Sequence, residues 1–195
     1  MNFSFKDEII LENEFVRISP LQENSYDFLK EIALNEKNLV QYSPSKINSE
    51  ENLKDYISKA ISERKNKIRY AFVIFDKKQN AYAGSTSFGS ISNYDSRIEI
   101  GWTWIGKQFQ KTGLNRQMKY LMMEYVFEKL EFERLEFRTD ERNEASRNAI
   151  MKIGGNFEGI LKSHTLMNDG FRRSTVYYGI LKSEWPEIKK NIFKK

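Results

Sequence analysis

The spacing of hydrophobic and polar residues divides the chain into segments with strand patterns and segments with helix patterns. Strands are expected where short runs are rich in β-branched and aromatic side chains, or alternate apolar with polar residues. Helices are expected where apolar residues recur every three or four positions. The expected strands are residues 14–20, 69–75, 81–90, 98–105 and 134–139, and the expected helices are residues 23–34, 49–65 and 114–130.

The last third of the chain continues with a helix, a hairpin and a closing helix. The helix starts near Asn143 and is expected to end at Gly154, a residue suited to the position after a helix. Two further strands flank Asn168-Asp169-Gly170, a strong hairpin signal, and Pro186 fits the first turn of the closing helix. The two strands are residues 157–167 and 173–181. The order β-α-α-β-β-β-α-β-α-β-β predicts an α/β fold with a mixed sheet.

The loop between the strand 98–105 and the helix 114–130 is the first candidate binding site. This polar loop, residues 106–113, carries Lys107 and Lys111. A loop that leads into a helix presents free backbone N–H groups and the positive end of the helix dipole, which suits a phosphate or pyrophosphate. The loop is neither a P-loop nor a Gly-x-Gly-x-x-Gly motif. The alternative interpretation is an ordinary turn between strand and helix with solvated lysines.

Three motifs resemble those of the GNAT superfamily of N-acetyltransferases. Gln110-Lys-Thr-Gly113-Leu-Asn115 resembles the Q/R-x-x-G-x-G/A signature, with Asn115 in place of the second small residue. Residues 137–154 are similar to the second half of the family in its RimJ/RimL-like branch. The ending, Asp169-Gly170-Phe-Arg-Arg-Ser-Thr-Val-Tyr-Tyr and then Glu184-Trp185-Pro186, is similar to the same branch. The chain is therefore expected to be a single GNAT domain over residues 1–195.

The resemblance implies both a fold and a reaction. In the GNAT fold, a mixed, mostly antiparallel sheet is flanked by helices, and strands 4 and 5 splay apart so that acetyl-CoA enters the gap. The implied activity moves the acetyl group of acetyl-CoA to a primary amine, either a protein N-terminus or a small amine. The transfer is expected to be direct, within a ternary complex. The identity of the amine and of the physiological acyl group stays open.

The resemblance also implies residues that hold acetyl-CoA. Loop amides would bind the pyrophosphate, while backbone N–H groups near the end of the preceding strand would receive the pantetheine arm and polarise the carbonyl. Asn143 matches an Asn that bonds the pantetheine, and its alternative role is a helix N-cap. The expected cofactor-binding residues are Trp104, Ile105, Lys107, Gln110, Lys111, Thr112, Gly113, Leu114, Asn115, Asn143 and Ser146.

Three residues are candidates for catalysis, each with a structural alternative. Glu99 is a candidate general base, because GNAT enzymes often place one on this strand; the alternative is an ion pair with Arg97 or Arg138. His164, the one histidine, has a suitable pKa without tuning, but it also fits a hydrogen-bonded structural residue. Ser146 is a candidate to protonate the leaving thiolate, or a helix serine bonded to its own backbone. The tyrosine that many relatives use for this step is replaced by Ile150.

Four aromatic residues are candidates to line an acceptor pocket: Tyr42, Phe88, Tyr94 and Trp102. Aromatic residues on strands more often belong to a core, and only Tyr42 and Tyr94 fall in expected loops. In the helix 114–130, Gln117 stands where the branch usually has Glu, beside Lys119. The identity of the acceptor therefore cannot be inferred from that of relatives.

Composition narrows the class of protein further. The chain has 195 residues and no cysteine, which excludes disulfides and thiol catalysis, and its single histidine argues against a metal site. No apolar run could span a membrane and no secretory signal is evident, so we expect a cytoplasmic protein. The net charge of +5 invites a nucleic-acid interpretation, but acidic and basic residues interleave, which argues against it.

Two rival functions remain at the level of sequence. One is a non-catalytic sensor that binds acyl-CoA on the same fold. The other is an RNA- or ribosome-associated binding module, suggested by the basic charge balance; it would lose RNA affinity steeply as salt rises. Whether the chain forms a homodimer is left open.

Overall fold

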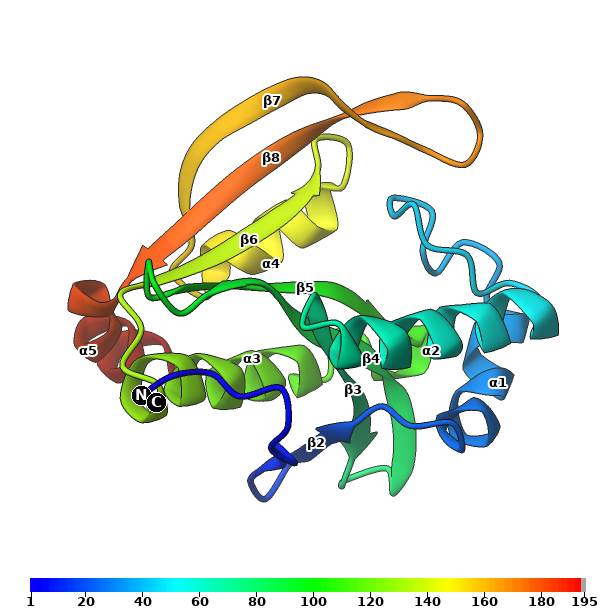
Figure 1. The fold of residues 1–195 in the computed structure, drawn as a ribbon, viewed down its shortest axis with the longest axis horizontal. Coiled ribbons are helices and arrows are strands. Elements are labelled where there is room, and N and C mark those ends of the chain that lie inside the picture. The colour runs from blue at the N-terminus through cyan, green and yellow to red at the C-terminus, as the bar shows by residue number, and fades with distance from the viewer. Residues whose placement is uncertain (194–195) are drawn as a thin grey trace.

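An eight-stranded sheet forms the centre of the protein in a computed structural model that describes residues 1–193 (Figure 1). Neighbouring strands follow the order β1-β2-β3-β4-β5-β6-β8-β7 and are antiparallel, except for the parallel pair of β5 and β6. The expected mixed, mostly antiparallel sheet is confirmed. The strands are β1 (Leu11–Glu12), β2 (Val16–Pro20), β3 (Arg69–Asp76), β4 (Ala81–Ser92), β5 (Arg97–Ile105), β6 (Arg134–Asp140), β7 (Asn156–Leu166) and β8 (Arg172–Leu181).

Helices cover both faces of the sheet. Buried side chains of α1 and α2 pack with Ala71, Val73 and Trp104 on one face. Buried side chains of α3 pack on the other face with Tyr70 and Phe72, the alternate positions of β3. The helices are α1 (Ser25–Asn35), α2 (Glu50–Lys65), α3 (Leu114–Glu124), which continues as a π-helical turn (Tyr125–Lys129), α4 (Glu144–Lys152) and α5 (Trp185–Ile188), with short 3₁₀ turns at Lys107–Phe109 and Lys182–Glu184 and a π turn at Lys189–Phe193.

Local sequence signals placed most boundaries within one or two residues. Ser49 caps α2 by accepting a hydrogen bond from the Asn52 amide, and Gly154 follows α4 with a φ of +97°. The N-terminal segment was not anticipated, because it lacks any periodic pattern. It nevertheless buries Phe3 and Ile9 in the same core as α3, and a short strand, β1, pairs with β2.

The parallel strands β5 and β6 separate after three paired positions. The last pair joins Glu99 to Glu136, after which β5 runs on to Ile105 and β6 to Asp140 without pairing with each other (Figure 1). These are the expected fourth and fifth strands, renumbered because of β1, so the predicted splay is confirmed. Near the opening, β5 also bulges against β4 between Gly101 and Trp104. The gap is therefore bordered by backbone groups that the sheet does not use.

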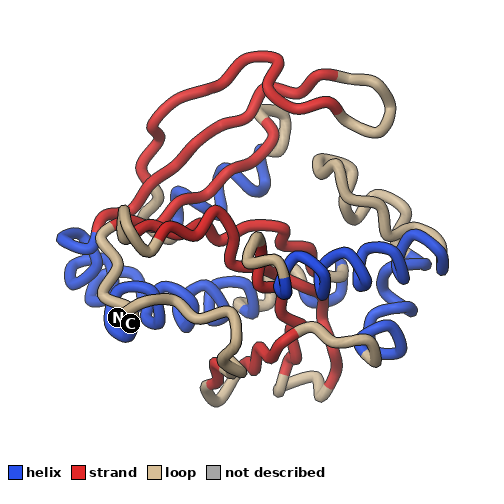
Figure 2. Tube along the Cα trace, viewed as in Figure 1, coloured by secondary structure: helices blue, strands red, loops and turns tan. Residues whose placement is uncertain are grey.

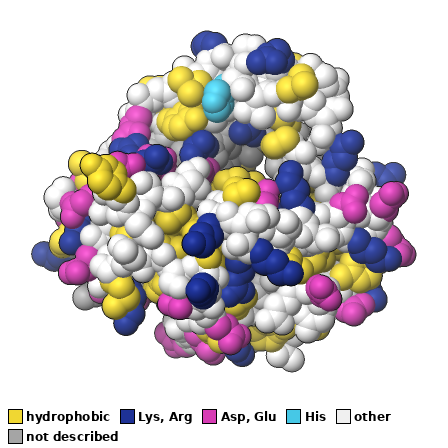
Figure 3. Space-filling model, viewed as in Figure 1, with side chains coloured by type: hydrophobic (Ala, Val, Ile, Leu, Met, Phe, Trp, Pro, Cys, Tyr) yellow, Lys and Arg dark blue, Asp and Glu magenta, His cyan; other side chains and the backbone are white. Residues whose placement is uncertain are grey.

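The long β7–β8 hairpin closes over one side of this gap. Its tip meets the loop between α1 and α2 (Figure 2): Asn168 donates to the Pro44 carbonyl at 2.8 Å, and Arg173 donates to the Tyr42 carbonyl at 2.7 Å. The surface is hollowed beneath the hairpin, with Lys and Arg side chains around the hollow (Figure 3). None of the helices within residues 1–193 combines the length and the apolarity that crossing a membrane requires.

Gly84→Ala is expected to destabilise the protein by about 3 kcal/mol, through overpacking and backbone strain. A Cβ at Gly84 would lie 2.0 Å from the Trp104 carbonyl oxygen, and the residue has a φ of +152°. Gly159→Ala is the matched control, because a Cβ there meets nothing within 4 Å. Chemical denaturation of both variants measures the difference; equal losses would mean that β4 and β5 are free to move apart.

Candidate active site

The loop after β5 presents backbone amides at the start of α3. Gly113 is the N-cap residue of α3 with a φ of +96° and has no side chain to cap the helix, while the Thr112 hydroxyl accepts a hydrogen bond from the Leu114 amide at 3.3 Å. In residues 1–193, the amides of Lys111, Thr112 and Gly113 donate to no protein group. Free N–H groups and the helix dipole attract a phosphate at this position. The loop therefore has the geometry of an anion site, as its sequence predicted.

Side chains of the loop divide into those that shape it and those that face solvent. Gln110 donates to the Ile105 carbonyl at 2.8 Å, and Thr112 donates to the Phe109 carbonyl at 2.8 Å. Both side chains therefore hold the loop in place. Lys107 and Lys111 are exposed, so their ammonium groups are available to an anion.

Two details of the loop limit which of its groups can meet a phosphate. The Lys107 amide is already bonded to the Glu36 carboxylate at 2.9 and 3.0 Å, so only the Lys107 side chain can meet a phosphate. Asn115 does not cap the helix, because Gly113 occupies that position; instead the Asn115 Oδ1 atom is buried and has no hydrogen-bond partner within residues 1–193.

The end of β5 offers one amide to the gap rather than two. The Gly106 amide donates to the Ala83 carbonyl of β4. Because backbone groups alternate in direction along a strand, the Trp104 amide points to β4 as well, and the Ile105 amide points into the gap. The Trp104 side chain is buried beside Tyr56 on the face of α1 and α2. Ile105 is accordingly the better placed of the two predicted pantetheine contacts.

Glu99 lies at the last paired position of β5, where the gap opens. Its side chain is buried, with 5% of the residue exposed; it accepts a hydrogen bond from Ser90 at 2.9 Å and forms an ion pair with Arg138 at 2.8 Å. Burial raises the pKa of Glu99 above its ordinary value, although Arg138 and Ser90 act in the opposite direction. The anticipated ion pair with Arg138 is thus present, whereas Arg97 pairs with Asp95 instead. A raised pKa suits a general base near neutrality, so Glu99 can form the ion pair with Arg138 and also serve as the general base.

His164 is on the same face of the sheet as Glu99. Its Nδ1 atom lies 3.1 Å from the Thr175 hydroxyl, and its ring lies 6.1 Å from the Tyr177 ring. The Arg138 guanidinium lies 5.2 Å from the same Tyr177 ring, so a chain of contacts joins His164 to Glu99. Their neighbours Phe137, Val176 and Tyr178 are buried on the opposite face with α3. His164 is exposed and hydrogen-bonded, which fits its structural alternative as well as a catalytic role.

Asn143 and Ser146 lie at the start of α4. Asn143 is the N-cap residue, and its side chain accepts a hydrogen bond from the Ser146 amide at 3.1 Å. The Ser146 hydroxyl bonds to no group of residues 1–193, so it is not held by its own backbone. Ile150, which replaces the family tyrosine, is buried in the core with 7% exposed.

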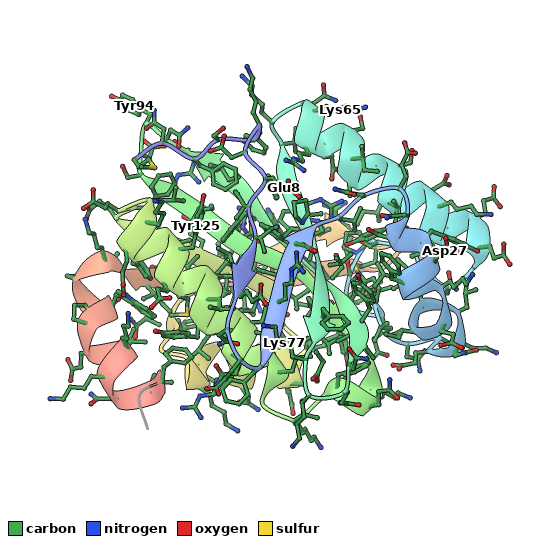
Figure 4. The ribbon with its side chains drawn as sticks, turned by 90° about the horizontal axis from the view of Figure 1, so that it is seen from below. Glu8, Asp27, Lys65, Lys77, Tyr94 and Tyr125 are labelled. Atoms are coloured by element: carbon green, nitrogen blue, oxygen red, sulfur yellow. The ribbon has the colours of Figure 1, made fainter. Side chains whose placement is uncertain are left out.

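The four aromatic candidates separate into two groups. Phe88 is fully buried on the face of α3, stacked on Tyr125, so it cannot line a surface pocket. Tyr94 is 98% exposed in the turn before β5 and projects from the edge of the molecule, at the closed end of the gap (Figure 4). The prediction that Phe88 and Tyr94 line an acceptor pocket is therefore wrong. Tyr42 contacts Arg173 at the hairpin tip, and Trp102, at the bulge, is 38% exposed, so these two remain candidates.

Lys119 belongs to the site although sequence reasoning gave it no role. Only 6% of the residue is exposed, and its ammonium donates to the Thr103 hydroxyl of the bulge at 3.0 Å. Burial lowers the pKa of Lys119 to about 7, with the charge of Glu99 acting in the opposite direction. The available signal was its place beside Met118 and Met122 in the apolar stripe of the helix, where a lysine is unusual.

Comparisons with known proteins agree with this geometry. The sequence matches the acetyltransferase (GNAT) domain family over residues 16–156. It has no significant match among curated protein sequences. The fold superposes on a GCN5-related N-acetyltransferase from Brucella melitensis with a TM-score of 0.87, at 26% identity, over 96% of this chain and 85% of that one.

Two further solved structures have the same fold. A candidate acetyltransferase from T. thermophilus aligns with a TM-score of 0.85 at 28% identity, over 94% of each chain. An acetyl transferase from Salmonella typhimurium, which modifies the N-terminal serine of ribosomal protein L7/L12, aligns with a TM-score of 0.78 at 21% identity, over 89% of this chain and 99% of that one. The splayed strands β5 and β6 and the anion loop before α3 agree with the family match, which covers most of the chain. This chain therefore belongs to the GNAT family and is an acetyl-CoA-dependent N-acetyltransferase.

Proposed function

We propose that the protein transfers the acetyl group of acetyl-CoA directly to a primary amine, with Glu99 as the general base. The observation that carries this proposal is the position of Glu99, a buried carboxylate at the mouth of the gap between β5 and β6. A free alkyl amine is protonated at neutral pH and must lose a proton before it attacks a carbonyl. A carboxylate with a raised pKa can take that proton, directly or through a water molecule.

In the proposed complex, the residues of the chain divide the work along the gap. The amides of residues 111–113, with Lys107 and Lys111, bind the pyrophosphate. The Ile105 amide and the Asn143 side chain bind the pantetheine arm, and the Ser146 hydroxyl faces the same region. The amine enters from the side of the β7–β8 hairpin, where Glu99, Arg138 and Tyr177 share one face of the sheet.

Direct transfer is favoured over a covalent acyl-enzyme. The chain has no cysteine, and no serine within residues 1–193 has its hydroxyl bonded to a histidine as a nucleophile would. Initial rates should therefore give intersecting rather than parallel double-reciprocal lines. Labelled acetyl-CoA should leave no label on the protein when the amine is absent.

The acceptor is proposed to be a protein N-terminus or a small primary amine, in keeping with the RimJ/RimL-like motifs.

Phe3 and Ile9 at one end of the chain and Trp185 at the other are buried in one core cluster, which supports a single domain over residues 1–195. On the surface in view, acidic side chains are interspersed among the basic ones, so this face does not favour the RNA-binding alternative (Figure 3).

Gly113→Trp is expected to abolish acetyl-CoA binding, because the new side chain would stand in the anion loop. The matched control is Gly170→Trp at the hairpin tip. Both glycines have a positive φ, +96° and +83°, and a Cβ at either meets nothing within 4 Å, so the backbone strain is similar. Calorimetry measures binding, and ligand at about 100 times its Kd should add about 2.7 kcal/mol of thermal stability to wild type and control.

The same experiment distinguishes an enzyme from a sensor. If the protein binds acetyl-CoA and then releases free CoA in the presence of alkyl amines or of peptides with a free N-terminus, acetyl transfer is supported. A thiol reagent detects that release without background from this cysteine-free chain. Binding with no release for any amine would favour the acyl-CoA sensor. No binding to wild type would show that the loop is an ordinary turn, and the proposal would fall.

A further inference from the structure

The Lys119 ammonium lies in the gap between the splayed strands. On one side, Nζ is 3.0 Å from the Thr103 hydroxyl of β5, four positions beyond the last residue paired with β6. On the other side, it is 5.6 Å from the ring centroid of Phe137, the first residue of β6 beyond that pairing. One residue from each diverging strand therefore brackets the ammonium, at the point where β5 and β6 no longer pair with each other.

Lys119 and Glu99 reach this point from opposite faces of the sheet. Lys119 comes from α3, whose side chains pack with Ile98, Ile100 and Phe137. Glu99 alternates with Ile98 and Ile100 along β5 and therefore points to the other face, where Ser90 and Arg138 bind it. A molecule lying in the gap would have the carboxylate on one side and the ammonium on the other.

The ammonium has more donors than the protein uses. A lysine ammonium carries three N–H donors, and within residues 1–193 Thr103 is the one hydrogen-bond acceptor for Lys119. Thr103 is itself bonded to Thr86 at 2.8 Å, which fixes its hydroxyl. Burying an ammonium with unpaired donors is costly, and an acceptor on a bound ligand would offset part of that cost. The remaining donors point to an acceptor that arrives with the substrate.

We propose that Lys119 donates the proton that the sulfur of CoA takes up as the thioester breaks. This assignment rests on the proposed acetyl transfer. Glu99 first takes a proton from the substrate ammonium and releases it to solvent. The neutral amine nitrogen then bonds to the carbonyl carbon and gives its second proton to Glu99; the carbon–sulfur bond breaks, its electron pair stays on sulfur, and Lys119 Nζ passes a proton to that sulfur. Solvent returns a proton to Lys119, and Glu99 releases its own, so the cycle closes.

Two features of this chain support the assignment. Ile150, at the position where many relatives have a tyrosine, is apolar and lies in the same core cluster as Phe137, so it cannot supply the proton. Burial lowers the pKa of Lys119 to about 7, so near neutrality it can both carry a proton and give it up. The charged group that acts on it is Glu99, whereas Thr103 and Phe137 are uncharged.

The ionisation of CoA bound to the protein tests this assignment without turnover. The ultraviolet absorbance of the thiolate gives the thiol pKa, and the complex with desulfo-CoA provides the baseline for tyrosine ionisation. The chain adds no thiol of its own. A thiolate beside Lys119 favours the charged ammonium, and the ammonium in turn favours the thiolate, so the two groups should titrate as a coupled pair. The thiolate absorbance should therefore develop at a lower pH in the wild type than in Lys119→Met, whose side chain carries no charge. The Lys129→Met control, at an exposed lysine after α3, should match wild type.

Each outcome separates the two proposals. Equal thiol pKa values in wild type and Lys119→Met, with CoA bound to both, would overturn the role of Lys119 and leave the acetyl transfer standing. Failure of wild type to bind CoA would remove both. In steady state, Lys119→Met should lower kcat by about 10²-fold with little change in the KM for acetyl-CoA, as expected for a lost general acid. An unchanged kcat would also overturn the assignment.

Discussion

Replacing Glu99 with Gln is expected to lower kcat for acetyl transfer by about 10²–10⁴-fold, the usual contribution of a general base. Glutamine keeps the size of the side chain and can still bond to Ser90 and Arg138, but it cannot take a proton from the amine. The KM for acetyl-CoA should change little, because the loop after β5 holds the cofactor. Steady-state kinetics with a single amine acceptor measures the loss.

The pH dependence of kcat/KM provides a second test of the role of Glu99. A base acts in its deprotonated form, so kcat/KM should fall as the pH drops through the pKa of Glu99. Because burial raises that pKa, the fall should begin at a higher pH than for an ordinary glutamate. In Glu99→Gln this part of the profile should disappear.

Glu136→Gln is the matched control for Glu99. Glu136 is the position paired with Glu99 across the strands, and its carboxylate is bonded to Arg134 at 2.9 Å. It should keep most of the activity, since no proposed step uses it. If Glu99→Gln is as active as this control and His164→Ala is not, then His164 is the base and Glu99 serves as the structural partner of Arg138.

Lys119→Met is expected to make the folded protein more stable near pH 7, by roughly 2–4 kcal/mol. The pKa of Lys119 is lowered from 10.5 in the unfolded chain to about 7 in the fold, chiefly by burial. Between these values the unfolded chain binds a proton that the folded protein does not, so the stability of the wild type rises as the pH rises from about 7 towards 10. Methionine has a similar volume and carries no charge, so the variant should lack this rise.

Denaturant unfolding of both proteins near pH 7 and near pH 10 measures the effect. The difference between them should be largest at the lower pH and should shrink as lysine becomes neutral in the unfolded chain too. Lys129→Met should follow wild type at both values, because Lys129 is exposed. A Lys119→Met variant that is less stable than wild type at every pH would mean that the ammonium is well paired in the fold.

Several features of the site could be predicted from the local sequence, because short-range geometry produces them. Gly113 follows from the need for a left-handed residue before α3, and Asn143 from the capping of α4. The ion pair of Glu99 with Arg138 was one of two alternatives, and only the pairing of β5 with β6 decided between Arg138 and Arg97.

Other features depend on which face of the sheet a residue occupies. Alternation along β4 places Phe88 in the core with α3, but which face carries the site follows from the positions of helices far away in sequence. Tyr94 lies in a loop, as expected, yet that loop is at the closed end of the gap. Aromatic character alone therefore could not separate these two residues from Tyr42 and Trp102.

The sequence by itself determined the order of elements from β2 onward, the anion loop, the hairpin and the family, because each depends on spacing within a few residues or on a motif. Only the tertiary structure decided the role of Lys119. On an isolated helix this lysine would be a solvated side chain beside an apolar stripe. It becomes a buried ammonium because β5 and β6 part above it, and that divergence arises from the pairing of strands that are distant in sequence.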